Sequence, residues 1–170
     1  MEHYFRYGDE TWYDAEIFEQ ETSKGQIIRF YFDDITSLLP FDDRIAAIVY
    51  NVGVLIEDAS VINDREYLLY DDATTTEITG RAPIEDGIKA LRMFRECMKI
   101  LREKNADCQV GFAISWLDEK RKKTYSKVVS KMGFELIDIG GEDCLYKMFD
   151  AVNKEAYKQN KANILAEIYG

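Results

Sequence analysis

Residues 110–134, VGFAISWLDEKRKKTYSKVVSKMGF, carry the clearest structural pattern in the chain. The first seven positions alternate between large apolar and very small side chains: Val110, Gly111, Phe112, Ala113, Ile114, Ser115 and Trp116. This period of two predicts a strand with one bulky face and one nearly bare face. Because the bare face is centred on a glycine, a helix or a ligand can approach it closely.

A helix is predicted directly after this strand. Asp118 stands where a side chain can cap the first turn. One stripe of the helix is apolar and consists of Arg121 through its aliphatic stem, Tyr125, Val128 and Met132. Gly133 then occupies the position at which a left-handed residue commonly ends a helix.

The same alternation of strands and helices extends on both sides of this stretch. Upstream, apolar residues recur every three or four positions from Ile84, which predicts a long amphipathic helix ending near Asn105. Downstream, strands are predicted over 134–139 and 144–149 around Gly140-Gly141, followed by a helix over 153–169. A helix between successive strands implies at least one right-handed parallel crossover.

The first half of the chain is rich in predicted strands. Residues 26–32 form one, and the apolar run 44–57 forms either two strands around a tight turn or one long strand buried on both faces. Two further segments, 66–70 and 74–78, also have strand character. Residues 12–21 are predicted to be weakly helical, and Asp34 is predicted to cap a short turn that Pro40 ends.

Composition excludes several classes of protein. With 46% hydrophobic residues in 170 positions, the chain can bury a substantial core, and it has no apolar run of the roughly 18 residues that span a bilayer. Its first residues lack a secretory pattern, and its three cysteines are widely spaced, so we expect a cytoplasmic protein with reduced thiols. The single histidine, His3, lies near the start at an end expected to fray, which argues against histidine-based catalysis or zinc ligation.

Charge is distributed unevenly along the chain. Residues 1–86 hold 6 basic and 20 acidic side chains, a net of −14, whereas the rest hold 16 and 12, a net of +4. Such an acidic half repels phosphate backbones, so no direct nucleic-acid binding is expected. It attracts an amine substrate or a basic protein partner instead, and the basic run 120–123 allows a homo-oligomer by pairing with the acidic half of another copy.

The order of elements over 44–149, together with Lys131, Gly133 and Phe134, resembles the GNAT superfamily of N-acyltransferases. In that family the corresponding helix ends in a Tyr-Glu-Lys-x-Gly-Phe run. The resemblance implies an α/β (α+β) fold with a mixed, mostly antiparallel central sheet, one parallel crossover and helices on both faces. It also implies one GNAT-like domain over residues 1–150, with residues 151–170 as a helix packed on it or extending from it.

The resemblance further implies acetyl-CoA bound between two splayed strands, with its pyrophosphate on the amides that open the long helix. The family loop Arg/Gln-x-x-Gly-x-Gly/Ala falls on residues 80–90. The chain departs from it in three ways: Ile84 stands at the Arg/Gln position, Lys89 at the last small position, and the carboxylates of Glu85 and Asp86 beside the expected phosphates. The predicted cofactor-binding residues are Arg81, Gly87, Ile88 and Lys89.

For catalysis, the family's usual general acid is a tyrosine four residues before the glycine, where this chain has Val129. Tyr125, one helical turn earlier, is the predicted substitute. The predicted general base, which would deprotonate an amine, comes from Glu57, Glu66 or Glu77, with Glu77 preferred. No metal is expected, because acidic doublets such as Asp42-Asp43 are typical of turns and no calcium-binding loop pattern is present.

Three functions therefore stay open from the sequence. The first is an acetyl-CoA-dependent N-acyltransferase of a cationic amine, which has lost several family residues. The second is a non-catalytic GNAT-like structural or interaction protein, by analogy with such modules in tailed phages. The third is an acidic mimic of nucleic acid that occupies a DNA-binding partner.

Overall fold

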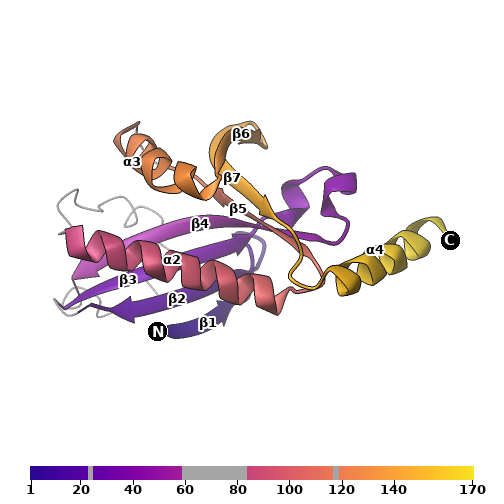
Figure 1. Ribbon diagram of the computed structural model, residues 1–170, viewed down its shortest axis with the longest axis horizontal. Helices are drawn as coiled ribbons and strands as arrows, with labels where there is room; N and C mark the ends of the chain where they lie inside the picture. The colour runs from indigo at the N-terminus through magenta and orange to yellow at the C-terminus, as the bar shows by residue number, and fades with distance from the viewer. Residues whose placement is uncertain (23–24, 59–83, 117–118) are drawn as a thin grey trace. The chain divides into compact units, whose positions relative to one another are not determined.

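The computed structural model describes residues 1–22, 25–58, 84–116 and 119–170 (Figure 1). It is a mixed α/β structure with a seven-stranded sheet in the order β1-β2-β3-β4-β5-β7-β6. The strands are β1 (Glu2–Arg6), β2 (Ala15–Glu21), β3 (Gln26–Asp34), β4 (Ala47–Asp58), β5 (Gln109–Ile114), β6 (Glu135–Ile139) and β7 (Glu142–Phe149). The predicted mixed, mostly antiparallel sheet is confirmed at this level.

Three α-helices and three short 3₁₀ turns accompany the strands in the described residues. They are α2 (Ile84–Lys104), α3 (Glu119–Val129), α4 (Lys154–Tyr169), η1 (Thr36–Leu38), η2 (Phe41–Arg44) and η4 (Ser130–Met132). The predicted helices over 84–105 and 153–169 are confirmed. No helix in the described part of the chain is long and apolar enough to cross a bilayer.

The apolar run from 44 to 57 forms one continuous strand, β4, rather than two strands around a turn at Gly53. Its first half pairs in parallel with β5, from Ala47 opposite Gln109 to Val52 opposite Ile114. Since α2 lies between these two strands in the sequence, the predicted parallel crossover is confirmed. The strand segments predicted over 66–70 and 74–78 lie outside the described residues.

Contacts divide the chain into two compact units, Met1–Phe32 with Gly53–Cys97, and Asp33–Val52 with Met98–Gly170. The first unit is centred on aromatic rings. Phe18 of β2 meets Phe32 of β3 edge-on at 5.6 Å, and Phe30 stacks on Phe94 of α2 at 5.6 Å between ring centroids. These contacts fix the first half of α2 on one face of β2 and β3. The single domain expected over residues 1–150 stays a prediction.

Two predictions within the first unit are wrong. Residues 15–21 form a strand and not the predicted weak helix. The prediction failed because Glu16 and Glu19 are buried, at 3% and 5% exposure. Burial of both acids hides the alternation that a strand normally shows. His3 is not at a frayed end: it lies in β1, with its Nε2 2.6 Å from a Glu16 carboxylate oxygen and its ring stacked on Phe18.

The second unit packs small and aliphatic side chains against η1. Its buried cluster contains Ile35, Leu39, Val49, Ala113 and Cys144. The predicted cap is displaced by one residue, because Ile35 and not Asp34 is the N-cap of η1. The Asp34 carboxylate still accepts a hydrogen bond from the Thr36 amide at 3.0 Å. The close approach at the small side of β5 comes from the neighbouring strand β7 and not from the predicted helix or ligand, because a Cβ at Gly111 would lie 2.8 Å from the Tyr146 hydroxyl oxygen.

Turns and caps in the second unit follow the sequence closely. Gly140 and Gly141 have φ of +64° and +89° and connect β6 to β7. Gly133 ends η4 in the left-handed region at φ +89°, as predicted. Asn153 caps α4 through its side-chain oxygen, which accepts from the Ala156 amide at 3.0 Å, and no residue of α4 is fully buried.

Candidate functional site

The candidate ligand-binding site lies at the carboxyl ends of the parallel strands β4 and β5. Their parallel ladder stops at Val52 and Ile114, although β4 continues to Asp58. In the sequence, β5 is followed by α3, which begins at Glu119. Ligands of open α/β sheets bind outside the carboxyl ends of parallel strands.

Two polar side chains meet at this edge of the second unit. The Ser115 hydroxyl donates a hydrogen bond to the Asn51 side-chain oxygen at 3.2 Å. Asn51 is half-buried and Ser115 is exposed, so the hydroxyl oxygen and the Asn51 amide remain available to a bound molecule. The pair lies on the face of β5 that carries its small side chains.

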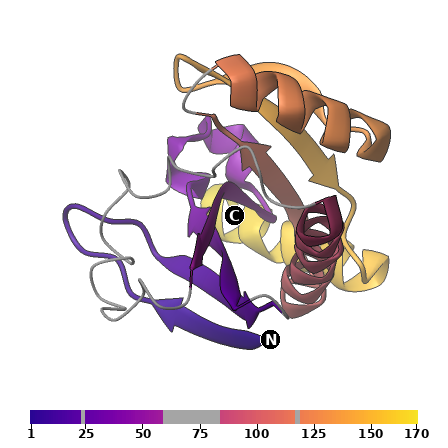
Figure 2. The same cartoon turned by 90° about the vertical axis from the view of Figure 1, so that its left-hand side faces the viewer.

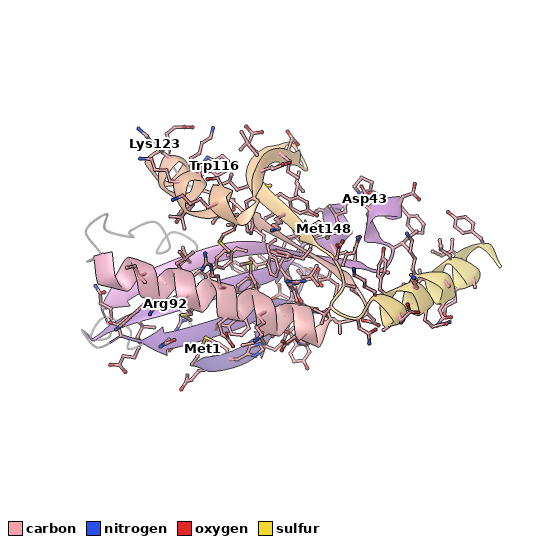
Figure 3. The ribbon with its side chains drawn as sticks, viewed as in Figure 1. Met1, Asp43, Arg92, Trp116, Lys123 and Met148 are labelled. Carbon is pink, nitrogen blue, oxygen red and sulfur yellow. The ribbon has the colours of Figure 1, made fainter. Side chains whose placement is uncertain are left out.

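An aromatic and a basic residue extend this edge toward α3. The Lys122 ammonium lies 5.3 Å from the centroid of the half-buried Trp116 ring, within cation–π distance. Trp116 is labelled in Figure 3. Together Asn51, Ser115, Trp116 and Lys122 form what we call the strand-end cluster. It can donate and accept hydrogen bonds, stack against a flat group and balance a negative charge.

Tyr125, the predicted general acid, lies in α3 and is half-buried. It shares the inner side of the helix with Val129, which is 4% exposed, whereas Val128 is 41% exposed. The predicted stripe is therefore wrong at Val128, and the buried stripe runs through Tyr125, Val129 and Met132. An aliphatic side chain packed in the core occupies the position where the resemblance places a tyrosine.

The predicted cofactor-binding residues divide between described and undescribed segments. Gly87, Ile88 and Lys89 lie at the start of α2, where Ile88 is 49% exposed and Lys89 is half-buried. They belong to the first unit, whereas Tyr125 belongs to the second. Arg81 lies outside the described residues, as do Glu66 and Glu77, and the side chain of Glu57 is not described.

A buried polar network in the first unit was missed by the sequence analysis. Arg29 donates to one carboxylate oxygen of Glu19 from Nε at 2.9 Å and from Nη2 at 2.6 Å. The Tyr4 hydroxyl donates to the same oxygen at 3.0 Å, and Arg29 Nη1 donates to the Tyr31 hydroxyl at 3.3 Å. An arginine amid the β-branched and aromatic residues of 26–32 was the available signal in the sequence.

Burial determines what this network can do. Arg29 is 0% exposed and Glu19 is 5% exposed, so neither reaches a substrate in solution. Burial raises the pKa of Tyr4 and of Tyr31, so both phenols keep their protons at neutral pH. The network therefore orders β1, β2 and β3 and is not a general-base site.

The three cysteines are unsuited to nucleophilic chemistry. Burial raises the pKa of Cys97 to about 12, and that of Cys108 and Cys144 to about 11. The thiolate is the reactive species, so all three are unreactive at neutral pH. Within the described ranges, no group of three His, Cys, Asp or Glu side chains is placed to hold a metal ion.

No known protein family, curated protein or solved structure matches this chain.

Proposed function

We propose that this protein is a GNAT-like, acyl-CoA-dependent N-acyltransferase that acts on a cationic amine. The observation that carries the proposal is the parallel pairing of β4 with β5, two strands that α2 connects in the sequence. This pair ends at the polar side chains of Asn51 and Ser115. Support also comes from the helix after β5, which ends in a left-handed glycine followed by the buried Phe134. The family arrangement of helices on both faces of the sheet is part of the same proposal.

The donor is placed at the start of α2. The amides of the first helical turn have no partner within the helix, and the helix dipole favours an anion there. Gly87 leaves the backbone bare for a diphosphate, while Lys89 and Arg81 supply positive charge. Ile88, which is exposed near the start of the same helix, contacts the part of acetyl-CoA next to the diphosphate.

The cationic acceptor is attracted electrostatically, because the first 86 residues carry a net charge of −14. In the reaction, Glu77 first takes a proton from the acceptor ammonium, and the resulting neutral amine attacks the thioester carbonyl, so that a C–N bond forms and the C–S bond breaks. The departing thiolate takes a proton from Tyr125, and the second nitrogen proton passes to the Tyr125 phenolate.

Acetyl-CoA binding tests this proposal directly. At about 100 times its dissociation constant, acetyl-CoA stabilises the fold by about 2.7 kcal/mol, which thermal unfolding detects. Gly87→Asp, which adds a charged side chain facing the phosphates, should abolish the shift. Ala162→Asp adds the same charge at an exposed position of α4 and should leave the shift intact. A chain without any shift at millimolar acetyl-CoA is not an acyltransferase.

A second candidate is favoured by one observation, the core packing of Val129 at 4% exposure. A chain that keeps the scaffold and buries the catalytic position is a non-catalytic structural or interaction protein. Two measurements distinguish it from the enzyme. It binds no acetyl-CoA, and it transfers no acetyl group to any amine, although its fold is intact.

A further inference from the structure

One side of α3 and η4 carries a row of exposed lysines, Lys123, Lys127 and Lys131, spaced one helical turn apart. We call it the lysine row. Within the described residues none of the three forms an ion pair, and the only acid of α3 is Glu119 in its first turn. Like charges at this spacing destabilise a helix, and within α3 only Glu119, four residues before Lys123, offsets this repulsion.

The hairpin of β6 and β7 has the opposite character. Between 135 and 146 it has no basic residue and four exposed carboxylates, which we call the acidic hairpin: Glu135, Asp138, Glu142 and Asp143. Asp138 accepts from the Gly141 amide at 3.0 Å and so shapes the turn. Burial, and then the negative charge of Asp143, Asp138 and Glu142, raises the pKa of Cys144 to about 11, so the hairpin has a concentrated negative field.

Each charged surface also exposes one aliphatic side chain. Val128, beside Lys127, is 41% exposed, and Leu136, beside Glu135, is 52% exposed. Both surfaces belong to the second unit, and α3 and the hairpin lie next to each other in Figures 1 and 2. The Lys147 side chain of β7 also donates a hydrogen bond to the Met132 carbonyl at the end of η4, which connects the hairpin to the end of the lysine row.

We propose that the lysine row of one copy docks on the acidic hairpin of a second copy, in a two-fold dimer that also buries Val128 and Leu136. In a two-fold pair each copy offers both surfaces, so the complementary contact forms twice. A nucleic acid would suit the lysine row alone, but the adjacent acidic hairpin repels it. The net charge of −10 on each copy does not prevent association, because charges farther apart than about 8 Å are screened at physiological salt.

Sedimentation of the full chain tests the dimer. Because the contacts are ionic, raising sodium chloride from about 50 mM to about 500 mM should weaken association at least about tenfold. A triple variant, K123E/K127E/K131E, should be monomeric. A matched control, K154E/K158E/K161E, makes the same charge change at exposed positions of α4 and should stay dimeric.

A charge-swap mixture identifies the contact. The variant E135K/E142K/D143K, which spares the turn-forming Asp138, should also be monomeric alone. Mixed in equal amounts with K123E/K127E/K131E, it should restore a dimer, because acidic α3 then meets a basic hairpin and basic α3 meets an acidic hairpin. Circular dichroism checks that each variant is folded.

Three results would overturn the proposal: a wild-type chain that is monomeric at every salt concentration, an α4 control that dissociates as readily as the α3 variant, or a mixture that stays monomeric. Wild-type binding to a short DNA duplex, lost in K123E/K127E/K131E without any dimer, would assign the lysine row to nucleic acid instead. None of these outcomes depends on acetyl-CoA binding, so the dimer and the proposed activity can fail separately.

Discussion

The Lys147 ammonium donates a hydrogen bond to the backbone carbonyl of Met132 across 2.6 Å. It therefore satisfies one of the carbonyls left open where α3 and η4 end. Gly133, the next residue, is left-handed at φ +89°, and a side chain there would start 3.1 Å from the same ammonium. Phe134 then enters the core at 4% exposure. The Gly-Phe part of the pattern that carries the family resemblance thus has a local structural cause.

Gly133→Ala should destabilise the fold by about 1.5 kcal/mol, because a Cβ in the left-handed region costs roughly 1–2 kcal/mol. In a domain of this size that loss lowers the melting temperature by roughly 3–6 °C. Gly133→Asn should cost less, since asparagine tolerates this conformation. Urea unfolding of the three proteins checks the order, and equal stability of the alanine variant and the wild type would contradict it.

Gly111→Ala should cost about 1–3 kcal/mol, because the added methyl group overpacks the sheet. Its Cβ would lie 2.8 Å from the Tyr146 hydroxyl oxygen. Tyr146→Phe removes that oxygen, so the double variant should recover part of the loss. Gly53→Ala is the matched control on β4, where the nearest atom is 3.7 Å away, and it should be neutral or slightly stabilising. A double-mutant cycle by urea unfolding measures the coupling, and additive losses would exclude this contact as the cause.

Glu19→Gln should destabilise the fold by about 3 kcal/mol, because it leaves the Arg29 charge buried without its partner. Arg29→Met should cost about as much, and the double variant less than the two single losses together. A contrasting pair is Glu155 with Lys158, which is 3.7 Å apart and largely exposed. Glu155→Gln should therefore change stability by less than about 0.5 kcal/mol. Similar losses at both sites would show that burial does not set the strength of the first pair.

Much of the second unit, together with α2, which the two units share, could be predicted from sequence because their signals are local. The alternation around Gly111, the period of α2 and the glycines at 133, 140 and 141 each depend on neighbouring residues. The first unit hid its pattern because its buried acids meet partners distant in sequence, as Glu16 meets His3 across thirteen positions. For the same reason the Ser115–Asn51 contact could not be predicted, since sixty-four positions separate the two residues.

Alkaline pH should destabilise the fold through Cys97. Burial raises the pKa of this thiol to about 12 from its ordinary 9.0, so the folded chain disfavours the thiolate. The contribution of Cys97 to stability is complete below pH 9 and is lost as pH rises from 9 toward 12. Over that window the free energy of unfolding should fall by about 1 kcal/mol per pH unit from this group alone. Urea unfolding between about pH 8 and pH 10.5 measures the slope. Cys97→Ala should show a shallower slope, because all other titrating groups are common to both proteins, and identical slopes would mean that the thiol ionises as readily in the folded chain as in the unfolded one.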